Sequence, residues 1–150
     1  MKLMQLYHTN KLSIFGSKTS SELALPFVEA GISAGFPSPA DDFLELTIDL
    51  NKELIKHPST TFYGKVKGDS MQDAGFNNGD LLIIDKSLQP FDGKIAVCFI
   101  DGEFTVKRIK KDNNFIWLMA ENKNYQPIKV TQDNDFIVWG MVTYIIKSVY

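Results

Sequence analysis

The sequence predicts a mostly β fold with a short helix and an extended N-terminal arm. Short apolar, β-branched and aromatic runs succeed one another from about residue 62 onward, with turn residues between them. The pair Asp101-Gly102 separates two of these runs and is a strong hairpin signal. The 150 residues are 44% hydrophobic and 12% aromatic, which is enough to fill one core.

We expect residues 1–40 to form a flexible arm and residues 41–150 to form the globular domain. The stretch 30–40 combines Gly and Pro, which is typical of a linker. The N-terminus Met1–His8 lacks the apolar run of a secretory signal, and no stretch approaches the roughly twenty apolar residues of a membrane span. These features predict a cytoplasmic protein that does not contact a membrane.

The expected elements then follow in chain order. Apolar positions 48, 50, 54 and 55 predict a short helix over Ile48–Lys56 that ends before His57-Pro58. A turn is expected at Asn77–Asp80. Strands are expected at Phe62–Lys67, Leu81–Asp85, Lys94–Ile100, Glu103–Lys110, Phe115–Met119 and Phe136–Ile146.

Charge and cysteine content exclude several classes of protein. The net charge is −2 and the pI is about 5.6, which gives no overall basic signature for nucleic-acid binding. A single cysteine excludes an intrachain disulfide, and Cys98 lies in an apolar run that predicts a core position. No Cys/His cluster suggests a metal ion, and we expect no cofactor.

The segment Gly68-Asp69-Ser70-Met71 offers a serine nucleophile. A serine hydroxyl needs a neighbouring base, and His8 and His57 are poorly placed for a Ser-His-Asp triad. Lys107 can act as the base if an apolar pocket lowers the pKa of its amine by several units from about 10.4. Taken alone, however, a Gly-Asp-Ser segment is usually a turn, and most strand lysines point into water.

The strand around this lysine has a period of two. Alternation along Glu103–Ile109 places Lys107 on the same face as Thr105 and Ile109 and sends Arg108 to the opposite face. We therefore expect this face of the strand to contribute to the apolar surroundings of Lys107.

Three motifs together resemble the LexA/UmuD group of self-cleaving serine peptidases. They are Gly68–Met71, Asn78–Asp85 and Asp101–Lys107, and their spacing agrees as well. The chain is most similar to the UmuD-like members, because Gly35–Ala40, Ile48–Asn51 and His57–Ser59 also recur in order. The resemblance runs from about Ala34 to the C-terminus and implies a β-rich peptidase fold.

The resemblance implies that Ser70 attacks a peptide bond in the chain's own arm with Lys107 as general base. The implied bond is Ala34-Gly35, where the family often has Cys-Gly. The pair Ala30-Gly31 is a second candidate, but it lacks the Phe-Pro-Ser-Pro continuation. We expect the backbone N–H groups of Asp69 and Ser70 to stabilise the oxyanion.

The resemblance also implies partners. It implies a homodimer, cleavage promoted by a RecA–single-stranded DNA filament, and a product that serves a UmuC-type error-prone translesion polymerase during the SOS response. Sequence-specific DNA binding is not expected, because the first 34 residues are too few for a helix-turn-helix domain and a linker. A non-catalytic binding module and a LexA-like regulator fragment stay open as alternatives, as does cleavage in cis or in trans.

Overall fold

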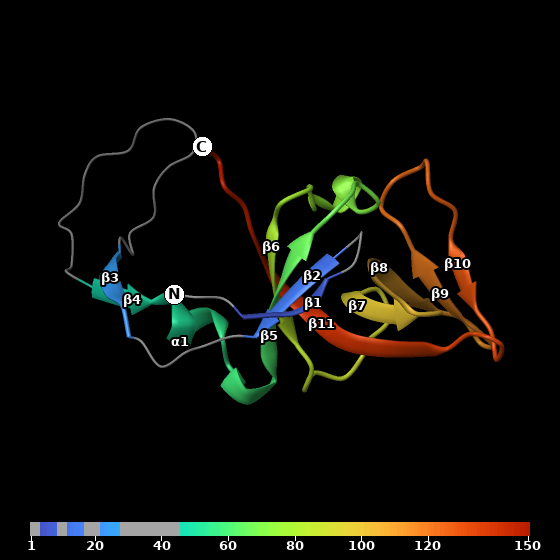
Figure 1. The fold of residues 1–150 in the computed structure, drawn as a ribbon, viewed down its shortest axis with the longest axis horizontal. Helices are drawn as coiled ribbons and strands as arrows, with labels where there is room; N and C mark the ends of the chain where they lie inside the picture. Colours follow the sequence, from blue (N-terminus) through green and yellow to red (C-terminus); the bar gives the residue numbers. More distant parts are fainter. Residues whose placement is uncertain (1–3, 9–11, 17–21, 28–45) are drawn as a thin grey trace. The chain divides into compact units, whose positions relative to one another are not determined.

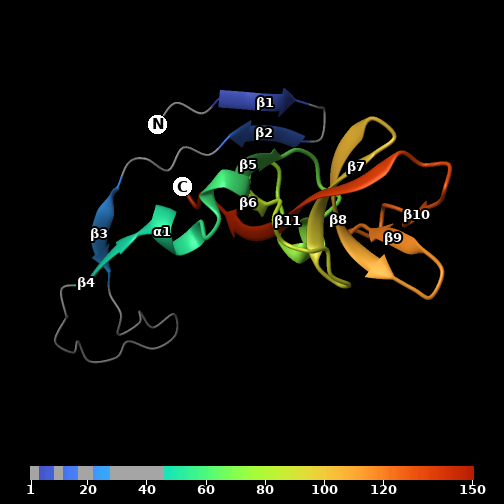
Figure 2. The same cartoon turned by 90° about the horizontal axis from the view of Figure 1, so that it is seen from below.

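The structure is a computed structural model that describes residues 4–8, 12–16, 22–27 and 46–150. The chain divides into two compact units, one of residues 1–18 with 57–150 and one of residues 19–56. The larger unit holds a nine-stranded sheet in the order β1-β2-β5-β6-β11-β7-β8-β9-β10, shown in Figures 1 and 2. Its strands are β1 (Met4–His8), β2 (Leu12–Gly16), β5 (Thr61–Val66), β6 (Leu81–Asp85), β7 (Ile95–Ile100), β8 (Glu103–Lys111), β9 (Ile116–Met119), β10 (Ile128–Val130) and β11 (Phe136–Ile146).

The predicted mostly β fold is confirmed, and the strand pairs of the sheet are antiparallel. The long strand β11 lies in the middle, where residues 141–146 pair with β6 and residues 136–141 pair with β7. Gly140 allows this double pairing, because a Cβ at this position would lie 2.6 Å from Ile84 Cγ2. Strands β6 and β11 have the predicted bounds.

The predicted hairpin at Asp101-Gly102 is confirmed and joins β7 to β8 (Figure 1). Both turn residues have positive φ, 49° for Asp101 and 86° for Gly102, as a tight two-residue hairpin turn requires. Ile100 faces Glu103 across the turn, so the register of the whole β7–β8 pair is set here. That register fixes the position of Lys107.

Two apolar clusters cover the two faces of the sheet. Consecutive residues of β7 alternate between them, since Val97 belongs to one cluster while Ala96 and Cys98 belong to the other. Cys98 is fully buried, as predicted, and its desolvation raises the pKa of the thiol to about 12. Cys98 is therefore a core residue and not a nucleophile.

The smaller unit holds β3 (Ala24–Phe27), β4 (Leu46–Asp49) and α1 (Leu50–Leu54). The predicted helix over Ile48–Lys56 is correct in place but too long. Ile48 and Asp49 pair with β3 instead, and the Asp49 carboxylate caps α1 by accepting from Asn51 N at 3.0 Å. The first two residues of the predicted helix, Ile48 and Asp49, therefore belong to strand β4 instead.

Residues 1–40 are expected to form a flexible arm, but the described parts of this stretch include the strands β1, β2 and β3. Strand β2 pairs with β5 in register from Leu12–Val66 to Gly16–Phe62, and Leu12 and Ile14 are fully buried. Pairing with a distant strand satisfies their backbone groups, which a local pattern does not reveal. The predicted boundary at residue 40 and both candidate cleavage sites, Ala34-Gly35 and Ala30-Gly31, lie outside the described residues.

Candidate functional site

The segment Gly68–Ser70 forms a turn between β5 and the short 3-10 helix η2 (Gln72–Ala74). Gly68 has a φ of 90°, which L side chains rarely adopt, so the glycine of this motif has a conformational role. Its N–H donates to Asn78 Oδ1 at 3.1 Å, and the Asp69 carbonyl accepts from Gln72 N at 3.1 Å. These bonds present Ser70 half-buried at the end of the turn.

The structure brings Lys107 to this serine. Lys107 lies on β8 opposite Ala96 of β7 and is 6% exposed. Its Nζ lies 3.0 Å from Ser70 Oγ, although the two residues come from different parts of the chain. The sequence-predicted pair is thus within hydrogen-bonding distance.

Two further acceptors of β8 surround the amine. Lys107 Nζ lies 2.7 Å from Thr105 Oγ1 and 3.0 Å from the Val106 carbonyl oxygen. Lys107 and Thr105 share one face of the strand, as predicted. Because a neutral amine has two N–H groups and one lone pair, these two acceptors can take the N–H groups while the lone pair faces the Ser70 hydroxyl.

A cavity of about 420 Å³ surrounds this pair. One part of its lining is apolar and includes Val66, Met71 and Phe76, all of which are buried. Another part is polar and includes Asp101, Glu103 and Asn134. The combination of apolar lining and a few polar groups is typical of a ligand-binding site.

The structure adds a segment that the sequence analysis missed. Glu121 N donates to the Ser70 carbonyl at 2.9 Å, and Asn122 Nδ2 donates to the Asp69 carbonyl at 3.0 Å. The Tyr125 hydroxyl donates to Asp69 Oδ1 at 2.5 Å, and this bond is the main cause of the raised pKa of Tyr125. No motif marks these residues, because they lie more than fifty positions from their partners and in no periodic pattern.

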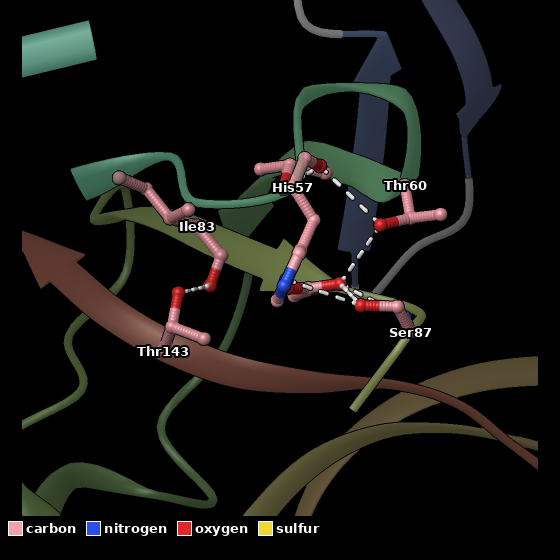
Figure 3. A network of polar contacts seen from close by, with 7 residues as sticks. His57, Thr60, Ile83, Ser87 and Thr143 are labelled. Carbon is pink, nitrogen blue, oxygen red and sulfur yellow. Dashed lines mark hydrogen bonds and ion pairs between the residues drawn. The ribbon is translucent and has the colours of Figure 1, made fainter. Parts of the chain in front are cut away.

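The histidine set aside in the sequence analysis has a different role in the structure. His57 Nδ1 lies 2.5 Å from Asp85 Oδ2, and Asp85 Oδ1 accepts from Ser87 Oγ at 2.7 Å and Thr60 Oγ1 at 3.0 Å (Figure 3). Burial alone would raise the pKa of Asp85, but the bonds from His57, Ser87 and Thr60 outweigh it, so the pKa is lowered. These contacts join the start of β5 to the end of β6.

Within residues 4–8, 12–16, 22–27 and 46–150, no group of three or more His, Cys, Asp or Glu side chains is arranged to hold a metal ion. In the same ranges, no helix has the length and apolar content needed to cross a membrane.

Comparison with known proteins identifies relatives over most of the chain. Residues 26–143 match the family model described as Peptidase S24-like. Protein MucA of Salmonella typhimurium is 38% identical over 136 residues, which cover 89% of this chain and 92% of MucA. Protein SamA of the same species is 40% identical over 77% of this chain and 79% of SamA. The LexA repressor of a Shewanella species is 40% identical over 86% of this chain and 62% of the repressor.

Proposed function

The chain belongs to the Peptidase S24-like family, and from this premise we propose that it is a serine endopeptidase that cleaves its own N-terminal segment. Ser70 is the nucleophile and Lys107 is the general base. The observation that carries the proposal is the 3.0 Å separation of Lys107 Nζ from Ser70 Oγ, in a site where the lysine is nearly excluded from water. A candidate base must lie within about 2.6–3.2 Å of the proton that it removes.

The burial of Lys107 supports the role of base. Removing an ammonium group from water disfavours its charged form, and a neutral amine has the lone pair that proton transfer needs. Thr105 Oγ1 and the Val106 carbonyl oxygen orient the amine by accepting its N–H groups. The lone pair is then directed toward the serine.

The proposed reaction has two stages. Lys107 takes the Ser70 proton as Oγ attacks the Ala34 carbonyl carbon, and the N–H groups of Asp69 and Ser70 stabilise the oxyanion. Collapse breaks the Ala34-Gly35 bond, and protonated Lys107 gives its proton to the new amine of Gly35. Water then hydrolyses the Ser70 ester, with Lys107 again taking a proton, and releases the carboxylate of Ala34.

We extend the proposal to the biological role of the product. On the similarity to MucA and SamA, the chain acts as a UmuD-like protein of SOS mutagenesis in the bacterial cytoplasm. A RecA–single-stranded DNA filament promotes the cut, and the shortened homodimer serves a UmuC-type translesion DNA polymerase. The similarity to a LexA repressor favours one competing role, that of a LexA-like regulator, which would require specific binding to operator DNA.

The test is to incubate the purified full chain from neutral to alkaline pH and to follow its intact mass. Fragments of residues 1–34 and 35–150 are expected from the wild type only, at a rate that rises with pH as the Lys107 amine becomes neutral. Ser70→Ala and Lys107→Ala are the matched controls. A wild-type chain that stays whole, both alone at alkaline pH and with RecA filament, would leave the non-catalytic binding module as the function.

A further inference from the structure

The segment Glu121–Tyr125, between β9 and β10, contacts the turn that carries Ser70 through hydrogen bonds from three of its residues. We infer that this segment is a brace that sets the position of Ser70 against Lys107, and that Asn122 is its main positioning residue. The inference rests on the proposed peptidase function and assigns a role to residues that have no part in the proton transfers themselves.

Asn122 is the buried part of the brace, with only 5% of its surface exposed. Its Nδ2 donates to the Asp69 carbonyl at 3.0 Å, while its Oδ1 accepts from Asn124 N at 2.9 Å. Both ends of the amide are therefore used, and a flipped amide would place oxygen against oxygen and N–H against N–H. A buried amide with a single satisfied orientation holds the Asp69-Ser70 peptide in one place.

Glu121 connects the same turn to the strand that carries the base. Its N–H donates to the Ser70 carbonyl at 2.9 Å, and its own carbonyl accepts from Asp73 N at 2.8 Å. Its carboxylate forms an ion pair with the guanidinium of Arg108. Because Arg108 follows Lys107 on β8, a continuous set of contacts runs from the nucleophile turn to the base.

Arg108 is itself held in place on the other side, since its Nη1 donates to the Gly93 carbonyl at 2.7 Å. The two anchors fix the guanidinium between Gly93 and Glu121. Arg108 points away from the face of Lys107, as predicted. Strand β8 therefore carries the proposed base on one face and, on the other face, the arginine that contacts the brace.

Tyr125 is the solvent-exposed part of the brace and lines the cavity beside the serine. Its hydroxyl donates to Asp69 Oδ1 at 2.5 Å. This contact gives Asp69 a structural role at the turn and limits rotation of its side chain. We expect a smaller contribution from Tyr125 than from Asn122, because water competes for exposed hydrogen bonds.

Position matters here because a shift of 1 Å in a reacting group can lower a rate by about 10²-fold. The Gly68 end of the turn is held by Asn78, and the Ser70 end is held by the brace. Loss of the brace is therefore expected to lower the fraction of molecules in which Ser70 Oγ lies within hydrogen-bonding distance of Lys107 Nζ. The chemistry of either group is not changed.

The experiment compares two substitutions in the full chain. Asn122→Asp keeps the acceptor for Asn124 but removes the donor to Asp69, and Asn122→Ala removes both without adding charge. Two rates are measured against pH: self-cleavage, and labelling of Ser70 by a fluorophosphonate, in which the serine oxygen displaces fluoride from phosphorus and Lys107 takes the proton. Asn113→Ala, in the exposed turn after β8, is the control for an asparagine elsewhere.

We expect Asn122→Ala to lower the plateau of both rates about 10- to 100-fold, with the midpoint of the pH profile unchanged. Asn122→Asp is expected to lower the plateau similarly, because the lost donor is common to both variants. If Asn122 only stabilised the fold, both substitutions would lower the melting temperature, and the plateau rate of the molecules that stay folded would be unchanged. Wild-type rates in either folded Asn122 variant would overturn the inference.

If the Asn122 variants do not fold, Tyr125→Phe tests the brace in their place, because it removes one exposed hydroxyl and keeps the ring. A several-fold lower plateau is expected, because Asp69 Oδ1 then loses the hydrogen bond from the Tyr125 hydroxyl. Tyr144→Phe is the matched control, since Tyr144 and Tyr125 are 42% and 44% exposed. An unchanged Tyr125→Phe rate would then refute the brace, whereas a wild-type chain that neither cleaves nor labels would refute the peptidase proposal itself.

Discussion

Thr105 Oγ1 accepts a hydrogen bond from Lys107 Nζ at 2.7 Å, and both side chains are buried on the same face of β8. The residue that orients the proposed base is therefore its own neighbour two positions earlier in the strand. Because residues i and i+2 of a strand share a face, this contact depends on local geometry. It needs no other element of the fold.

Thr105→Val is expected to slow self-cleavage by about 10-fold or more, because the isosteric valine leaves one buried N–H of Lys107 without this acceptor. Thr105→Ser restores the hydroxyl and is expected to restore most of the rate. Intact-mass time courses at one alkaline pH give both rates. Equal rates for the valine and serine variants would show that the hydroxyl has no orienting role.

Lys107→Arg is expected to abolish self-cleavage, with a fall of more than about 10²-fold, even though the positive charge is kept. A guanidinium stays protonated at every pH used for proteins and cannot accept the serine proton. Lys65→Arg, at an exposed position of β5, is the matched control and is expected to cleave normally. Cleavage by Lys107→Arg at the wild-type rate would exclude the amine as the base.

Gly68→Ala and Gly102→Ala form a second matched pair, because both glycines have positive φ and open space around the missing Cβ. Each substitution is expected to lower the free energy of unfolding by about 1–2 kcal/mol through backbone strain. Only Gly68→Ala is expected to slow cleavage as well, since its turn carries Ser70, whereas the strained Gly102→Ala turn keeps the β7–β8 register that positions Lys107. Urea unfolding and cleavage rates separate the two effects, and equal slowing in both variants would contradict a local role for Gly68.

Asp85 is expected to make stability depend on pH. Its pKa is lowered in the folded chain, so its contribution is fully present above the unfolded pKa of about 3.9 and is lost as the pH falls through the folded value. Asp85→Asn is expected to lower the free energy of unfolding by about 1–3 kcal/mol at neutral pH. Urea unfolding at neutral and acid pH measures the difference between the two proteins, which is expected to shrink on acidification.

Cys98 is expected to resist alkylation in the folded protein. Its thiol is fully buried and has a pKa of about 12, so both access and thiolate are lacking at neutral pH. Iodoacetamide is expected to modify it only after the protein is unfolded in denaturant. Rapid labelling of the native chain, read by mass, would show that this part of the core opens readily.

Local patterns were sufficient for β5, β6, β7, β8, β9 and β11 and for the hairpin turn beside the site, although not for β10. Strands β6 and β11 have the predicted bounds, and the Asp101-Gly102 hairpin follows from two residues that tolerate positive φ. Alternation along β8 placed Lys107 beside Thr105. The pairing of Ser70 with Lys107 came from motif resemblance, because neither residue alone distinguishes a catalytic group from a turn serine or a strand lysine.

Tertiary structure alone decided the remainder. Strand β2 joins the sheet through β5, and Asn122 reaches the Asp69 carbonyl from 53 residues away. Such contacts depend on which distant segments the fold brings together, so a single asparagine or a five-residue strand has no distinctive signal of its own in the sequence. The sequence by itself determined the local conformations and the candidate pair. The packing of distant segments decided how the nucleophile is held, because a hydrogen bond is set by separation in space and not by separation along the chain.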